Sequence, residues 1–153
     1  MILTLLMLHV LLSVVLIGAI THQALSFWKP HAASGRHILT SFRAVRSTAY
    51  TNTIAILYVL TSIGGSIVYP TYVLDAKKPL TDMNLNLAIG AFEVKEHLAM
   101  IGIAILPAYV AYWRKAENGQ ELFTRKALTL MVAAFVWWNF VVGHVLTDLR
   151  GIF

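Results

Sequence analysis

The six histidines are the residues of this sequence best suited to chemistry. Three of them, His9, His97 and His144, fall within long apolar stretches. An ionisable side chain is costly inside a membrane and therefore indicates a functional site. Neutral imidazole ligates haem iron and copper, and it exchanges protons near neutral pH. The three residues are therefore candidate ligands of haem b or of copper, or members of a site that handles protons or quinone.

Two residues near His97 extend this set. Glu93 precedes His97 by four positions, so the two side chains share one face of a helix. Met100 lies close to the same face, and its thioether suits copper. Glu93 and Met100 are therefore possible additional metal ligands beside His9, His97 and His144.

The remaining histidines are weaker candidates. His22 lies near the end of the first apolar stretch, whereas His31 and His37 fall in a basic segment where we expect them to be solvated. The sequence leaves open whether His22 is a ligand, and whether the chain holds one haem, two or none.

Apolar stretches that must position these side chains make up most of the chain. Hydrophobic residues account for 58% and charged residues for 12%, and the mean hydropathy is +0.71. A soluble domain of this size cannot bury so much apolar surface. Four stretches are long enough to cross the ~30 Å hydrocarbon core as helices: 2–28, 50–74, 85–113 and 126–149. The sequence predicts an all-α integral membrane protein, with residues 1–153 forming one transmembrane domain, a four-helix up-down-up-down bundle.

The connecting segments predict orientation. The segment 29–46 has four basic residues and no acidic one, and 114–126 has four basic and two acidic residues. The segment 75–82 balances two lysines with two aspartates. Because cytoplasmic loops are enriched in Lys and Arg, 29–46 and 114–126 should be cytoplasmic. Both termini then lie in the periplasm, with the chain in a bacterial inner membrane. The net charge of +5 thus reflects topology, and we expect no nucleic-acid partner.

In this topology the three intramembrane histidines lie in the outer half of the bilayer. An up-down bundle places its first and third helices diagonally, so His9 and His97 could ligate one haem from opposite sides. His144 would be a further ligand or would tune the site from nearby. In the second span, Gly64 and Gly65 should let a neighbouring helix or a flat cofactor approach the backbone closely.

The first span also carries a family resemblance. The run Leu8-His9-Val10, followed by Leu16-Ile17-Gly18-Ala19, resembles the first helix of CopD-like haem membrane proteins. The size and the histidine placement resemble small four-helix cytochrome b membrane anchors. The resemblance implies that His9 ligates haem or another metal.

These observations favour a redox role without catalysis by the chain itself. No motif for nucleotide binding, for a Ser nucleophile or for a zinc hydrolase is present, and the absence of Cys excludes disulfides and iron–sulfur clusters. The predicted function is a membrane electron-transfer or anchor subunit that binds haem b within a larger respiratory or redox complex. Its partners would be other membrane subunits, and quinone or a periplasmic redox protein. The alternatives are a cofactor-free structural or assembly subunit and a copper-handling membrane protein.

Overall fold

The computed structural model describes residues 2–26, 47–115 and 119–150. Its four long helices are α1 (Ile2–Ser26), α3 (Ser47–Tyr72), α5 (Asn86–Arg114) and α6 (Gly119–Arg150). A π-helical turn, η1 (Val73–Lys77), and a single-turn helix, α4 (Lys78–Asp82), follow α3. The described residues contain no strand, so this part of the chain is all-helical. The predicted loop 29–46, with His31 and His37, lies outside the described residues.

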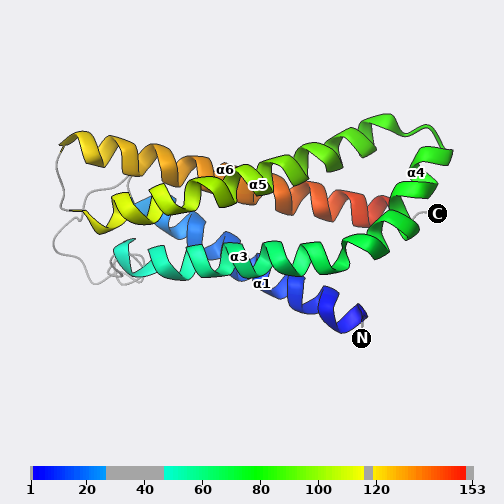
Figure 1. Cartoon of the computed structure of the whole chain (residues 1–153), viewed down its shortest axis with the longest axis horizontal. Coiled ribbons are helices and arrows are strands. Elements are labelled where there is room, and N and C mark those ends of the chain that lie inside the picture. The colour runs from blue at the N-terminus through cyan, green and yellow to red at the C-terminus, as the bar shows by residue number, and fades with distance from the viewer. Residues whose placement is uncertain (1, 27–46, 116–118, 151–153) are drawn as a thin grey trace, which may run out of the picture.

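The long helices lie side by side (Figure 1). Helix α1 packs against α3 and α6, and α5 packs against the same two helices. The pairs α1 with α5 and α3 with α6 are therefore diagonal. The N-terminal end of α1, helix α4 and the C-terminal end of α6 lie at the same end of the molecule, which we call the α4 end.

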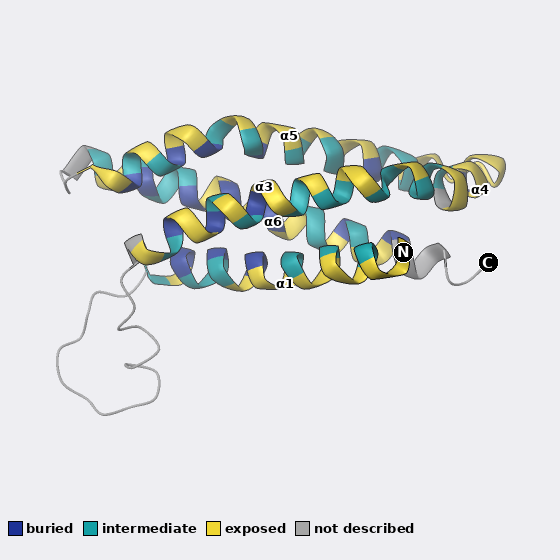
Figure 2. Cartoon of the chain, turned by 60° about the horizontal axis from the view of Figure 1, so that its bottom comes forward, coloured by how far each residue is buried: buried dark blue, intermediate teal, exposed yellow. Residues whose placement is uncertain are grey.

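Three helical stretches of the described residues are long and apolar enough to cross a membrane: Ile2–Ser26, Ala49–Asp82 and Glu121–Leu146. Helix α5, predicted as a fourth span, is not among them, and its first half carries Glu93 and Lys95. Exposed residues cover the outer surface of all four helices (Figure 2). Many of them are large and apolar, which is typical of helices that face lipid.

The predicted outer loop 75–82 is helical instead. Pro79 lies in the first turn of α4, where its missing N–H is not needed, so the chain continues from α3 through η1 into α4. The reversal comes at 83–85, where Asn84 has a φ of 58°. Asn adopts this left-handed conformation more readily than most residues.

The predicted inner loop 114–126 is also shorter than expected, because α6 begins within it. As a result Arg125 is helical and only 2% exposed. Its guanidinium donates to the carbonyl of Tyr112 at 2.8 Å and to that of Lys115, and lies 5.6 Å from the ring of Trp113. These carbonyls end α5 and have no partner within the helix. Arg125 is therefore a cap of α5 rather than a solvated loop charge.

The buried apolar side chains form two clusters. The larger contains Leu16, Ile17, Ile20, Ala24, Ile54, Tyr58, Leu106, Tyr109, Trp113, Val132, Ala133 and Val136. The smaller, towards the α4 end, contains Leu80, Phe92, Val142 and Leu146. Between them, α3 and α5 carry small and polar residues in place of buried aliphatic ones.

Candidate functional site

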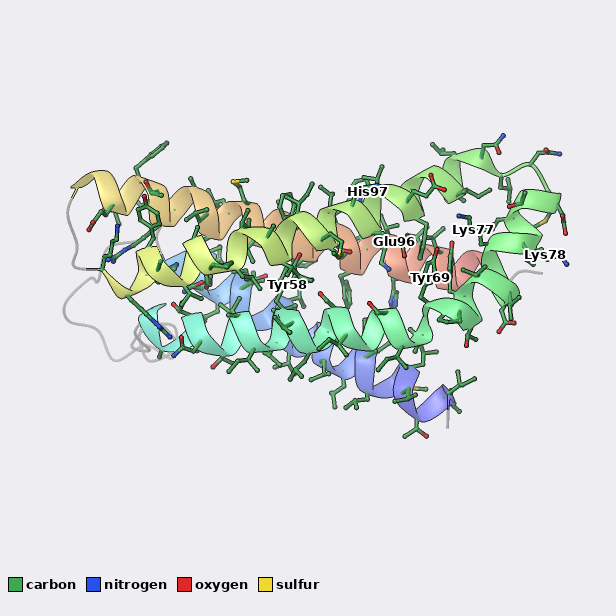
Figure 3. The ribbon with its side chains drawn as sticks, in the orientation of Figure 1. Tyr58, Tyr69, Lys77, Lys78, Glu96 and His97 are labelled. Carbon is green, nitrogen blue, oxygen red and sulfur yellow. The ribbon has the colours of Figure 1, made fainter. Side chains whose placement is uncertain are left out.

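The region between the two apolar clusters is the candidate site. We call it the polar layer and define it by His9, Thr61, Gly64, Gly65, Lys95, Glu96 and Gly143. Every long helix contributes to it. Figure 3 shows Glu96 between α5 and α3, on the same side of α5 as Tyr69. Ionisable groups at this depth of an apolar bundle indicate function more often than stability.

His9 is the contribution of α1, and its imidazole lies against the glycine pair of α3. A Cβ atom at Gly64 would stand 3.2 Å from His9 Nδ1, and one at Gly65 would stand 3.3 Å from His9 Cε1. Only glycine at these two positions leaves the imidazole its full room. The predicted close approach at the glycine pair is therefore confirmed, and the group that approaches is His9.

The polar layer contains buried polar atoms that lack partners. Among the described residues, two atoms of the layer, His9 Nδ1 and Thr61 Oγ1, are buried without a hydrogen bond, and so is the hydroxyl of Tyr72 beside it. Such atoms are rare in folded proteins because each costs free energy, so each calls for an explanation. A ligand that bonds to them would remove this cost.

Lys95 brings a positive charge into the layer. Its ammonium lies 4.7 Å from the centre of the Phe92 ring, and its Cε would be 3.6 Å from a Cβ at Gly143. Lys95 interacts electrostatically with His9 and with Glu96. Lys77 forms an ion pair with Glu93, whereas Lys95 has no carboxylate at salt-bridge distance among the described residues.

A stack of three aromatic rings lies beside the layer towards the α4 end. The rings of Tyr72 and Phe92 are 3.8 Å apart and nearly parallel, at 12°. Tyr69 lies 6.0 Å from Phe92 and 6.4 Å from Tyr72. The stack joins α3 to α5 and carries the Tyr72 hydroxyl, which interacts electrostatically with Glu96.

The other two predicted ligands face elsewhere. His97 is exposed, on the side of α5 away from α3, and its Nδ1 donates to the carbonyl of Glu93 at 2.7 Å (Figure 3). His144 is exposed on α6 and stacks on Phe140, with ring centres 5.5 Å apart. The structure brings neither into contact with His9. Across the described residues, no three His, Asp or Glu side chains are placed to hold a metal ion.

The additional candidate ligands are also on the outside. Met100 is 66% exposed, and Glu93 is exposed and paired with Lys77 at 3.3 Å. His22 belongs to the other half of the bundle, where its ring lies 4.9 Å from that of Tyr50.

A buried polar network lies in the larger apolar cluster, and the sequence pattern does not predict it. Gln23 is fully buried; it accepts a hydrogen bond from the hydroxyl of Tyr109 and donates to Thr51 Oγ1 at 3.2 Å. It links α1, α3 and α5. The signal in the sequence is the polar run Thr21-His22-Gln23 within an apolar stretch, and the hydrogen bonds of Gln23 explain this residue without a ligand.

Comparisons with protein-family models, with curated proteins and with solved structures find no match to this chain. We therefore infer the function from the polar layer.

Proposed function

We propose that the chain is an integral membrane protein of the up-down-up-down type, with α5 as its fourth span. Three apolar helices support membrane insertion, and α5 packs between two of them with a length similar to theirs. The basic segments 29–46 and 114–126 support a cytoplasmic position for the end of the bundle opposite the α4 end. Both termini then face the periplasm of a bacterial inner membrane, and the polar layer lies in the outer half of the bilayer.

Within this placement, we propose that the protein is an electron-transfer or anchor subunit of a redox complex, and that it holds haem b in the polar layer. The observation that carries the proposal is His9: an imidazole set between helices, with a buried and unpartnered Nδ1, against a glycine pair that keeps the facing backbone bare. A bound haem would carry single electrons. His9 would hold its iron, and Lys95 would face its negatively charged propionates.

Haem b held by two imidazoles would need a second histidine ligand beside His9. His97 has the local geometry of a ligating residue, because Nδ1 donates to a backbone carbonyl and leaves Nε2 free. However, both His97 and His144 are exposed, so α5 or α6 must turn about its axis to bring either one to the layer. We therefore propose His9 as the resident ligand and His97 as the ligand that haem binding would recruit.

The outward positions of His97 and His144 favour a second candidate function, a structural subunit without cofactor. In that case both histidines would contact lipid headgroups or a neighbouring subunit, and the unpartnered atoms of the layer would be bonded by water.

The visible absorption spectrum of the purified protein separates the two functions. We expect a Soret band that is lost in His9→Ala and kept in Ser13→Ala. Ser13 is a matched control, one turn along the same helix, where its hydroxyl donates to the carbonyl of His9 at 2.8 Å. Loss of the band in His97→Ala as well would indicate that α5 turns when haem binds. A wild-type protein without a band, after expression with excess haem, would reject the haem proposal in favour of the structural one.

A further inference from the structure

A groove runs between α3 and α5 in the half of the molecule away from α4. Its volume is about 470 Å³, and it is open to the outside. Ala55 and Val59 of α3 form one wall, and the α5 residues from Ile103 to Ala111 form the other. Small side chains explain the gap, because Ala55 and Ala111 do not fill the space between the two helices. The lining is apolar apart from one residue at its end, Arg114.

The charge at that end is positive and not neutralised within the described residues. Arg114 is exposed; its Nη2 donates to the side-chain oxygen of Asn52 at 3.1 Å, and it has no ion-pair partner in the described ranges. The ammonium of Lys115 follows directly and lies 4.5 Å from the centre of the Tyr112 ring. The guanidinium of Arg114 is therefore the charge at the end of the apolar groove, whereas the Lys115 ammonium lies over a ring that does not line it.

The dimensions of the groove match one leaflet of a bilayer. From Ile103 to Arg114, α5 rises about 16 Å at 1.5 Å per residue. Half of a hydrocarbon core is about 15 Å thick. With Arg114 at headgroup level, the apolar lining extends to about the bilayer midplane. The basic end of the groove also faces the leaflet in which anionic lipids concentrate, the cytoplasmic one.

We propose that this groove binds an anionic glycerophospholipid, with one acyl chain between α3 and α5 and the phosphate on Arg114. The proposal rests on the membrane placement above and is independent of haem, since the groove is lined by none of the residues of the polar layer. The lipid would fill the space between α3 and α5 and neutralise the charge at its end.

Thermal unfolding in nanodiscs of defined composition tests the proposal. We expect the wild-type protein to unfold at a higher temperature with phosphatidylglycerol present than in phosphatidylcholine alone. Arg114→Gln should weaken the retention of phosphatidylglycerol through purification by about five-fold, the effect of one cation near the surface. Lys78→Gln is the matched control, an exposed lysine at the α4 end, and should change neither measurement.

A second variant keeps the test decisive if Arg114→Gln folds poorly. Ala111→Leu leaves Arg114 in place but fills the groove, so it should also abolish the stabilisation by phosphatidylglycerol. Equal stability of the wild type in the two lipids would overturn the lipid site, as would equal effects of Arg114→Gln and Lys78→Gln. Co-purification of a quinone, or dimerisation through this face, with no retained phospholipid would also overturn it. A chain that stayed soluble without detergent would instead remove the membrane placement and the lipid site together.

Discussion

The imidazole of His9 on α1 rests on the bare backbone of Gly64 on α3, and a methyl group at position 64 would stand 3.2 Å from Nδ1. The contact joins the one predicted ligand that faces a neighbouring helix to the one pair of adjacent glycines in the chain. His9 and Gly64 should therefore respond to substitution as a unit.

The first prediction concerns this contact. Gly64→Leu places a side chain where the His9 ring lies, so the ring must leave or the helices must separate. We expect a loss of about 1–3 kcal/mol in the free energy of unfolding, as for other overpacked sites. Gly18→Leu is the control, because a Cβ there has open space around it. Equal thermal midpoints for the two variants in detergent would show that the close approach is not needed.

The second prediction concerns Gly102, which is buried against Tyr58. A Cβ at position 102 would lie 1.7 Å from the Tyr58 hydroxyl, which donates to the carbonyl of Ala99 at 3.2 Å. Gly102→Ala must therefore displace Tyr58 and break this bond, at a cost of about 1–3 kcal/mol. In a Tyr58→Leu background the same substitution should cost little. Additive effects of the two substitutions on the thermal midpoint would contradict the predicted clash.

The third prediction concerns the cap of α5. Arg125→Lys keeps the charge but loses the planar fork that reaches two carbonyls at once. We expect a loss of about 1–3 kcal/mol, because a buried carbonyl is left without a partner. Lys126→Arg, at the next position, should leave the free energy of unfolding within about 0.5 kcal/mol of the wild-type value. If Arg125→Lys is as stable as the wild type, charge alone is sufficient at this helix end.

The fourth prediction concerns the positive charge in the polar layer. Lys95→Met removes an ammonium that has no ion pair within the described residues and keeps most of the apolar stem. Without ligand, we expect the free energy of unfolding to rise by about 1 kcal/mol or more, because a desolvated charge has been removed. Any bound haem should show a lower reduction potential, since a nearby cation favours the reduced form.

Lys77→Met is the control for this charge. It breaks an ion pair at the surface, which is worth less than about 1 kcal/mol. A destabilised Lys95→Met variant would mean that Lys95 serves structure rather than a ligand.

The approximate positions of the four long helices could be predicted from the sequence because apolar runs set them. The residues at which the helices begin and end could not be predicted, and the reason differs between the segments 75–82 and 114–126. The run 75–82 has the composition of a loop, yet Pro79 occurs where a helix tolerates it. Arg125 belongs to a basic segment typical of a cytoplasmic loop, yet its side chain is buried because it donates to carbonyls at the end of α5.

The sequence predicts the level along the helices at which the candidate residues lie, but not which way each side chain faces. His97 and His144 lie in helices whose exposed faces also carry large apolar residues, so no amphipathic stripe distinguishes a lipid-facing from an inward-facing position. His9 differs because Gly64 and Gly65 provide a second, independent signal on the facing helix. Whether the layer holds haem remains a prediction.

The separation of the two apolar clusters has a consequence for native-state hydrogen exchange. The larger cluster is tied together by Gln23 and Arg125, whereas the smaller one has four buried apolar residues and borders a layer with unsatisfied groups. Cooperative units of unequal stability are expected to open separately. Amides of α4 and the adjoining turns of α3 and α5 should therefore exchange by a sub-global opening that leaves the far half of the bundle protected. A ligand in the polar layer would contact both halves of the bundle, so their amides should then show similar protection from exchange.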